Sequence, residues 1–529
     1  MSRSIGMVDL TQGMNTSDPL TVGALEKWGD GGSLLPRELG ALALGTNVTV
    51  PIMDAATGRY TGETRIGDLD NAATKPILLP VMEAAIYAET FWRHNTGRSY
   101  GHKPEVMAEA LEAARSNVGE LLGYDPSRHT VVFTSNTSHG MNLLSDIAAR
   151  DPKHYFVLSL MSHHSAQLPA REKGKYRFFG LHPDGTYDLD SIEQILASLS
   201  RQYQVYLVIE SESNITGYKP DLKAICAIAG KYGAKVFIDH AQGASNVPID
   251  LGSLEADAFI ALSGHKMYAL AGSGAVVGPT AFFAGVPMMP AGGTITAVTG
   301  DTIFYAEPPL NQEPGTVAYT PQISFGKAAA LLKSTGMDKI EEYERRLTQR
   351  VLDKLSAVEG VEIIGGVDML KMRRGPVVSI ALKDTLGVWG GMVEYFPPAF
   401  IGTALKLFYG IGTRVGFYCS HPYGYFMRGV GAEEANAHAL LHMEKRIPGC
   451  ALLPGDEKIY TTRFSFSMAT PPELLDSIPA MLESIRHLSP NNCVIKPDFE
   501  GNRWLVDSPE RLQIPGELFD LNRNTPCFR

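Results

Sequence analysis

The sequence has 529 residues, enough for roughly two to four domains, and 44% of them are hydrophobic, which is sufficient for a large buried core. Its formal charge of −10 argues against nucleic acid as a main partner, because binding phosphate needs a basic face. The five cysteines show neither a CxxC pair nor a Cys/His ligand spacing, so the sequence predicts no disulfide framework and no metal site.

Targeting and membrane signals are not found in the sequence. Its first residues lack an apolar signal core, and no apolar run approaches the length of about 18 residues that spans a membrane. We therefore expect a cytoplasmic protein in a reducing compartment, without membrane contact.

The chain begins with a weakly patterned segment. Residues 1–65 mix glycines, prolines and short apolar pieces without a period, and we expect an N-terminal extension that wraps the body.

Residues 68–74 predict a short strand. Apolar residues then predict helices from Leu79 to Trp92 and from Pro104 to Leu122.

Strands and helices alternate through the next part of the chain. The predicted strands lie at 130–133, 155–159, 205–209, 234–238 and 258–262, with helices at 136–149 and 221–232. Such alternation predicts an α/β fold with a mostly parallel sheet covered by helices on both faces. Ligands of open sheets bind beyond the carboxyl ends of the strands. Polar residues collect at or near those ends: Ser138, His163, Asn214, Asp239, Gln242, His265 and Lys266.

The pattern changes after a long irregular stretch at residues 285–320. Helices are predicted from Ile323 to Thr335 and from Met337 to Leu355, and the later strands and helices alternate less regularly. We predict four segments. They are the extension 1–65, a large domain 66–335, a smaller α+β domain 336–490 and a C-terminal tail 491–529, rich in Pro and Asn.

The stretch Ala261–Tyr268 places Lys266 between two apolar runs, the second entered through Gly272-Ser-Gly274. Burial is unfavourable for a charged amine and lowers its pKa, which makes it a nucleophile able to form a Schiff base with an aldehyde. A single lysine in a turn is more often simply solvated, so this interpretation depends on the surrounding residues.

Pyridoxal phosphate is the usual aldehyde cofactor held by a lysine, and its binding makes specific demands. Its ring nitrogen needs a carboxylate, which Asp239 at a buried strand end offers, and His163 can stack on the ring. The ring oxygen suits a neutral donor such as Asn214 or Gln242. Its phosphate suits the backbone amides and hydroxyls of a helix N-terminus, as in residues 136–140, although such a segment is equally an ordinary helix cap.

These residues together resemble the class V aminotransferase superfamily, and most closely cysteine desulfurases and selenocysteine lyases. The resemblance covers about residues 68–490 and rests on six motifs in order: Asp70-Asn-Ala-Ala-Thr74, Asn136-Thr-Ser-His-Gly140, Ser162-His-His-Ser165, Ser213-Asn214, Ile238-Asp-His-Ala-Gln242 and Ser263-Gly-His-Lys266. It implies a fold type I pyridoxal phosphate enzyme with a large and a small domain. It also implies a homodimer whose sites lie at the subunit interface.

The resemblance implies a role for each matching residue. Lys266 is the Schiff-base lysine, Asp239 the partner of the ring nitrogen and His163 the stacking residue. The other cofactor ligands that it implies are Asn214, Gln242, Thr137, Ser138, Ser263 and His265 in the same chain, and Thr316 from the partner subunit, through the loop Glu313-Pro-Gly-Thr316. Residues implied to contact the substrate are Arg463, Asn71 and Ala72.

Arg463 and Cys419 bear on the reaction. Arg463 resembles the arginine that clamps an amino acid carboxylate, a task that suits its planar fork. Cys419 lies in Arg414-Val-Gly-Phe-Tyr-Cys419, which resembles the Arg-x-Gly-x-x-Cys pattern of cysteine desulfurases, whose thiol attacks the substrate sulfur. This chain has Phe417-Tyr418 where the family often has a histidine just before the cysteine, and His421 is a candidate nearby base.

We therefore expect an enzyme acting on L-cysteine or a related sulfur or selenium amino acid, with a sulfur-acceptor protein as a possible partner. One alternative keeps the cofactor but makes the chain an aminotransferase, epimerase or C–S lyase for a specialised biosynthetic amino acid. A second alternative is a catalytically inactive sensor or scaffold. It is disfavoured because lysine, aspartate, histidine and arginine are all present at the expected positions: Lys266, Asp239, His163 and Arg463.

Overall fold

The computed structural model describes residues 10, 14–96, 99–368, 373–444, 455–498 and 503–506. Cys450 and Cys527, counted in the sequence, lie outside these residues, as does most of the predicted tail. None of the described helices is long and apolar enough to cross a membrane.

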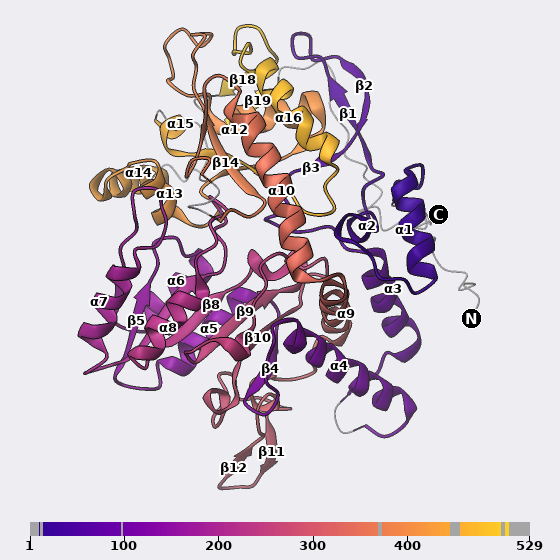
Figure 1. Ribbon diagram of the computed structural model, residues 1–529, viewed down its shortest axis with the longest axis vertical. Helices are drawn as coiled ribbons and strands as arrows, with labels where there is room; N and C mark the ends of the chain where they lie inside the picture. Colours follow the sequence, from indigo (N-terminus) through magenta and orange to yellow (C-terminus); the bar gives the residue numbers. More distant parts are fainter. Residues whose placement is uncertain are drawn as a thin grey trace.

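A seven-stranded sheet forms the larger part of the molecule (Figure 1). Its strands, in spatial order, are β4 (His129–Thr134), β10 (Gly274–Pro279), β9 (Ala258–Ser263), β8 (Lys235–Asp239), β7 (Gln204–Glu210), β5 (His154–Leu158) and β6 (Tyr176–Phe178). Only β10 runs antiparallel to its neighbours, and the pairs from β9 to β6 are parallel. The predicted mostly parallel sheet is thereby confirmed.

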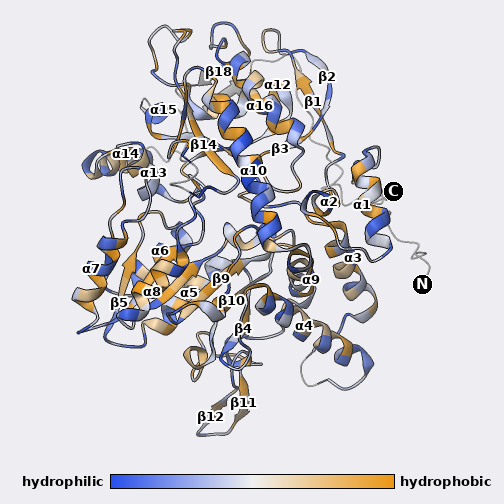
Figure 2. Ribbon diagram, viewed as in Figure 1, coloured by the Kyte–Doolittle hydropathy of each residue, from blue (hydrophilic) through white to orange (hydrophobic). Residues whose placement is uncertain are grey.

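Helices cover both faces of this sheet because alternate residues of its strands enter two different cores. In β7, Leu207 and Ile209 belong to one core, while Tyr206 and Val208 belong to the other. The first core includes residues of α4 (His102–Leu121), α7 (Leu189–Leu199), α8 (Leu222–Lys231) and α9 (Tyr319–Thr335), and the second includes residues of α5 (Thr137–Ala148) and α6 (His164–Lys173). In Figure 2 the central strands are mostly hydrophobic, as expected for strands buried on both faces.

A smaller antiparallel sheet with a separate core lies at the other end of the molecule (Figure 1). Its strands, in order, are β13 (Val361–Ile363), β14 (Val377–Leu382), β17 (Thr461–Ser465) and β16 (Arg414–Gly416). The helices that pack on it are α10 (Met337–Ser356), α12 (Pro398–Tyr409) and α16 (Pro472–Ile485). The arrangement of a large sheet domain and a smaller one is the predicted fold class; the exact boundaries stay a prediction.

The first 65 residues are more regular than their weak pattern predicted. They contain α1 (Pro19–Gly29), α2 (Pro36–Gly40) and a hairpin of β1 (Thr49–Met53) and β2 (Tyr60–Arg65). α1 begins with a helix start signal, since the Asp18 side chain accepts a hydrogen bond from the Leu20 N–H. Leu34, Leu39 and Leu42 are buried in the first core, so this segment is part of the folded body.

The remaining elements lie outside the two main sheets. The predicted helix from Leu79 to Trp92 is α3 (Leu79–Tyr87) followed by a π-helical turn, Ala88–Trp92. The stretch 285–320 carries a hairpin that projects from the large sheet in Figure 1. The other elements are β3 (Gly67–Asp68), paired with β15 (Ile411–Gly412); β11 (Ile295–Val298) and β12 (Ile303–Tyr305); α13 (His421–Met427), α14 (Ala432–Glu444) and α15 (Asp456–Ile459); and β18 (Ile495–Asp498) with β19 (Arg503–Val506).

Candidate active site

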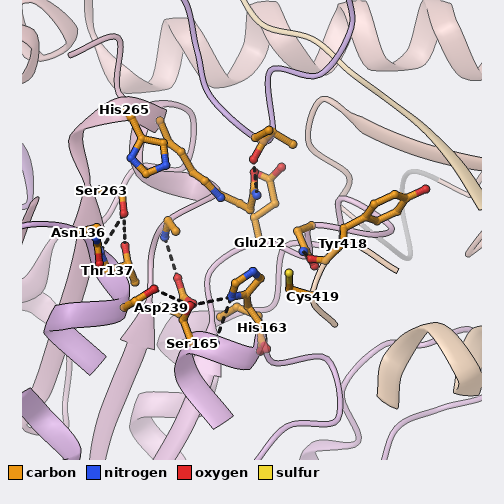
Figure 3. Close-up of a pocket in the computed structure, with 18 of the residues that line it drawn as sticks. Asn136, Thr137, His163, Ser165, Glu212, Asp239, Ser263, His265, Tyr418 and Cys419 are labelled. Atoms are coloured by element: carbon orange, nitrogen blue, oxygen red, sulfur yellow. Dashed lines mark hydrogen bonds between the residues drawn. The ribbon is translucent and has the colours of Figure 1, made fainter. Parts of the chain in front are cut away.

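A cavity of about 280 Å³ lies where the carboxyl ends of β7, β8 and β9 face the loop after β16 (Figure 3). Most of the residues singled out in the sequence line it: Ala72, Thr137, Ser138, His163, Asn214, Asp239, Gln242, Ser263, His265, Lys266, Cys419 and Arg463. The cavity therefore gathers, at one sheet edge, residues that are almost 400 positions apart.

Lys266 ends a short 3-10 turn, Gly264–Lys266, that follows the buried strand β9. Burial lowers the pKa of its amine to about 8, against the opposing attraction of Asp239, while Arg463 lowers it further. About a tenth of this amine is therefore uncharged at pH 7, far more than for an ordinary lysine, and the uncharged form is the one that a nucleophile or a base requires.

Asp239 is the last residue of β8, and its Oδ1 accepts a hydrogen bond of 3.0 Å from the Ala241 N–H. Burial raises the pKa of this carboxyl, although the Ala241 hydrogen bond and Lys266 oppose the shift. Asp239 is thus held in one orientation with a carboxyl group ready to share a proton with a basic ring nitrogen.

His163 caps α6, and its Nδ1 accepts a hydrogen bond of 3.1 Å from the Ser165 N–H. Burial, followed by the nearby charge of Lys266, lowers the pKa of His163 to about 3. The ring is therefore neutral at physiological pH and carries its proton on Nε2. A neutral flat ring is well suited to stacking on an aromatic cofactor.

Hydroxyl groups gather at the N-terminus of α5. The Ser263 Oγ accepts a hydrogen bond of 2.8 Å from the Thr137 N–H and lies 2.8 Å from Thr137 Oγ1, and Ser138 Oγ lies 2.6 Å from Ser165 Oγ. Asn136 caps the helix by accepting a bond of 2.9 Å from the His139 N–H. Backbone amides at a helix N-terminus combined with hydroxyls form an anion site.

Arg463 lies on β17, so the small sheet contributes this residue to the cavity lining. Its side chain is 2% exposed and donates to Asp70 Oδ1 at 2.6 Å and to the Asn214 carbonyl at 3.1 Å. The guanidinium carbon also lies 4.5 Å from the centre of the Tyr418 ring. The Nε of Arg463 is buried and has no hydrogen-bond partner among the described residues.

Cys419 lines the cavity with an exposed thiol, in the loop between β16 and α13. Tyr418 and Cys419 both have left-handed backbones, with φ of 52° and 63°. The loop is held by two hydrogen bonds, one of 2.8 Å from the His164 N–H to the Cys419 carbonyl and one of 2.6 Å from Asn214 Nδ2 to the Tyr418 carbonyl. Two adjacent left-handed residues of this kind are a strained conformation found at functional sites.

His421, the candidate base, contacts another histidine rather than the thiol. Its Nδ1 lies 3.1 Å from His164 Nε2, and among the described residues no hydrogen bond joins it to Cys419. Burial lowers the pKa of His421 to about 4, so the ring is neutral.

The structure does not bring two of the predicted residues to the cavity of this single chain. The Asn71 side chain donates to the Asp68 carbonyl at 3.0 Å and accepts from Ser467 at 2.8 Å, and so ties β3 to the segment after β17. Thr316 is exposed in the loop after Glu313, and this glutamate is anchored by Arg115 at 2.7 Å. A place for Thr316 in a neighbouring subunit's site stays a prediction.

Several lining residues were not predicted as site residues. Glu210 is the last residue of β7, and Glu212 lies two positions further along the chain. Burial raises the pKa of each carboxyl to about 7. Charged residues at the end of an apolar run were the available signal. Arg414 and Tyr418 also line the cavity, and their signal was their place in the motif around Cys419.

A family of known proteins matches the part of the chain that carries these cavity residues. A family model described as aminotransferase class-V matches residues 68–476. The chain belongs to the class-V aminotransferase family. This family depends on pyridoxal phosphate.

Curated members of the family include proteins similar to this chain. A probable cysteine desulfurase from Streptomyces coelicolor is 33% identical over 369 residues, which are 67% of this chain and 83% of the relative. A cysteine desulfurase from Klebsiella pneumoniae is 30% identical over 373 residues, 67% of this chain and 84% of the relative.

Solved structures share the fold. The apo cysteine desulfurase of Thermococcus onnurineus has a TM-score of 0.66 at 24% identity, with 79% of this chain and 94% of that chain covered. The cysteine desulfurase of Escherichia coli has a TM-score of 0.63 at 22% identity, with 79% and 94% covered. These two likenesses establish the architecture of this class-V chain.

The residues of the cavity fit the family's cofactor. Lys266 supplies a buried amine whose pKa is lowered, and Asp239 supplies a carboxyl group that a hydrogen bond holds in one orientation. A Cβ on Gly274 would lie 2.6 Å from the Leu262 carbonyl and 2.8 Å from Asn136 Cα, so only glycine lets the start of α5 come this close to the sheet. Amine, carboxyl and anion cradle are the donor set that pyridoxal phosphate needs.

Proposed function

We propose that this class-V protein is a pyridoxal phosphate enzyme that removes sulfur or selenium from L-cysteine or a closely related amino acid. The observation that carries the proposal is that the exposed thiol of Cys419 lines the same cavity as Lys266 and Arg463. A thiol nucleophile, a base and a carboxylate clamp are thus available to one bound amino acid.

Each cavity residue has a defined task in this proposal. When bound, pyridoxal phosphate supplies an aldehyde that condenses with amines and a ring that accepts electrons. Lys266 holds it and, once released, removes the proton from the substrate's α-carbon, which the lowered pKa of about 8 permits. Asp239 orients the ring nitrogen, and His163 stacks as a neutral ring.

Arg463 positions the substrate by its carboxylate. Its buried guanidinium is fixed by Asp70 and by the Asn214 carbonyl, so its remaining donors meet the carboxylate with little loss of conformational freedom. This contact directs the substrate's side chain toward the loop that carries Cys419.

Cys419 then accepts the sulfur. The thiolate Sγ attacks the substrate sulfur, so an S–S bond forms as the substrate's Cβ–S bond breaks. The bonding electron pair stays with Cβ, which takes up a proton, the α-carbon regains its proton from Lys266, and alanine leaves. The cysteine keeps the sulfur as a persulfide, which a thiol of an acceptor protein can take over by attack on the outer sulfur.

The experiment is to give L-cysteine to purified enzyme and to its Lys266→Ala and Cys419→Ser variants. We expect Lys266→Ala to lose both the cofactor's near-visible absorbance band and activity. Cys419→Ser should keep the band and lose sulfide release measured with a thiol reductant. Undiminished sulfur release by Cys419→Ser would exclude the persulfide step.

A second candidate is an aminotransferase, epimerase or C–S lyase acting on a larger, specialised amino acid. It is favoured by the carboxyl groups of Glu210 and Glu212, which line the cavity. The reaction proposed for cysteine gives these two groups no task, whereas a larger substrate could contact them. A keto product with the amine form of the cofactor would indicate transamination. Equimolar alanine and persulfide from cysteine would support desulfuration.

A further inference from the structure

A cluster of three side chains lies in the small region, outside the cavity. His438 and His442 come from α14 and Asp456 begins α15. His438 Nε2 and His442 Nε2 lie 2.8 and 3.0 Å from the same oxygen, Asp456 Oδ1, and the ligand atoms of all three residues lie within 4.8 Å of one another. The three side chains are at least nine-tenths buried.

The burial pattern of α14 is unusual for a surface helix. His442 is its only buried residue, while its apolar residues Leu440 and Met443 are 53% and 66% exposed. An amphipathic helix normally turns its apolar side chains inward. Here the inward positions are His438 and His442, four residues apart on one helix face, so polar groups attach this helix to the body.

Surrounding aromatic residues fix the two imidazoles. The Tyr425 hydroxyl lies 2.9 Å from His438 Nδ1, and the Tyr460 ring lies 5.5 Å from His438 and 5.9 Å from His442, between ring centres. A hydrogen bond to the far nitrogen of an imidazole is the usual support of a metal-ligating histidine, because it orients the ring and leaves the other nitrogen's lone pair for the metal. His438 has this bond, whereas the Nδ1 of His442 is buried without a hydrogen-bond partner among the described residues.

We propose that His438, His442 and Asp456 form a binding site for a divalent transition-metal ion, with zinc as the preferred metal. Imidazole and carboxylate ligands suit zinc, and a pair of histidines four apart on a helix presents both rings to one ion. Zinc bonds of about 2.0–2.2 Å at tetrahedral angles place ligand atoms roughly 3.4 Å apart, so each histidine nitrogen needs to move about half an ångström away from the Asp456 oxygen. The fourth position is open to water.

The cysteine and Cys/His spacings of the sequence predicted no metal site, because the three ligands of this cluster include no cysteine. His438 and His442 do have a ligand spacing, but Asp456 joins them only in the fold. From the metal site a chain of ring contacts reaches the Cys419 loop, since Tyr425 packs on Phe417 with 4.9 Å between ring centres. A bound ion therefore fastens α14 beside the loop that carries the thiol.

The test uses tag-free, full-length enzyme treated with a chelator and then titrated with Zn²⁺ or Co²⁺. We expect one equivalent to bind per chain, measured by elemental analysis and by competition with a chromophoric chelator. Bound Co²⁺ should give the visible absorption of a tetrahedral site.

His442→Gln and Asp456→Asn should weaken binding more than about tenfold, and Tyr425→Phe, which removes a supporting hydrogen bond, by about tenfold. The control is His487→Gln, because exposed His487 lies 3.6 Å from Glu483 in a similar but open pair. Cys419→Ala tests whether the thiol is the ligand. Retention of full affinity by His442→Gln, loss of binding in His487→Gln or Cys419→Ala, or no stoichiometric binding by the unmutated protein would each overturn the proposal.

Discussion

Lys266 and Asp239 show how burial determines the chemistry of single residues. Both lie at the end of a strand that is buried on both faces, and loss of hydration shifts each pKa toward the uncharged form. The two residues attract one another when charged, which limits both shifts. An amine ready to react and a carboxyl ready to share a proton are therefore consequences of one desolvated sheet edge.

This desolvation has a measurable effect on the stability of the cofactor-free protein. The folded-state pKa of Lys266 is about 8, below its ordinary value of 10.5, so the unfolded chain binds more protons between these pH values. The destabilisation is fully present below pH 8 and disappears as the pH rises to 10.5. At about 1.4 kcal/mol per pKa unit it amounts to about 3 kcal/mol.

We therefore expect Lys266→Met to stabilise the cofactor-free protein relative to the unmutated protein, and the gain to shrink by about 3 kcal/mol between pH 7 and pH 10.5. Denaturant unfolding at both pH values measures it. Lys223→Met is the control, because Lys223 is exposed on α8 and should show no such change. A gain independent of pH would show that Lys266 is not desolvated.

At the scale of elements, the start of α5 is positioned by the strands beneath it. β10 runs antiparallel between β4 and β9, and its first residue, Gly274, lies under Asn136. The backbone amides that follow Asn136 thereby reach the cavity edge beside Ser263. The anion cradle depends on this close approach, since any side chain at Gly274 would lift the helix.

Gly274→Ala should destabilise the protein by about 1–3 kcal/mol and weaken the binding of pyridoxal phosphate, because the added methyl group meets backbone atoms that cannot move aside. Cofactor affinity by absorbance titration and thermal unfolding measure the two effects. Gly300→Ala is the matched control, since its Cβ would meet nothing within 4 Å. Equal cofactor affinity in the two variants would refute this account of the cradle.

For the whole molecule, the cavity is built from both sheet regions. Arg463 of the small sheet bonds to Asp70 and to Asn214, which follows β7 of the large sheet. Thr316 lies elsewhere on the surface. Near it along the chain, the β11–β12 hairpin exposes Val298, Ile303 and Phe304 by 60%, 52% and 51%. Exposed apolar groups of this kind favour an interface, here the proposed homodimer.

If Thr316 serves the partner's site, defects in Lys266 and Thr316 should complement one another. A mixed dimer of a Lys266→Ala chain and a Thr316→Ala chain contains one site with both residues intact, so we expect its activity at limiting cofactor to exceed the mean of the two parents. As a control, a chain carrying both substitutions, mixed with unmutated chain, creates no intact site in the mixed dimer. A monomer by light scattering, or no complementation, would contradict this arrangement.

Much of the site could be predicted because strand ends are visible in the sequence. Lys266, Asp239 and His163 each follow an apolar run, and parallel strands bring such ends together. Glu212 also follows an apolar run, but that position alone does not tell whether its carboxyl faces the cavity or a structural partner, and only the fold shows that it lines the cavity. The helices and strands before residue 66 were not predicted, because elements this short contain too few repeats of the hydrophobic pattern to be recognised.

The sequence by itself determined the class of the fold and the candidate chemistry, since periodicity and the spacing of strand-end residues are local properties of the chain. Only the tertiary structure decided which side chains share one space. It placed Cys419 and Arg463 in one cavity, engaged Asn71 in a structural hydrogen bond and brought Asp456 to two histidines of α14. Contacts between distant segments depend on how two sheets and their helices pack, and packing is a property of the whole molecule.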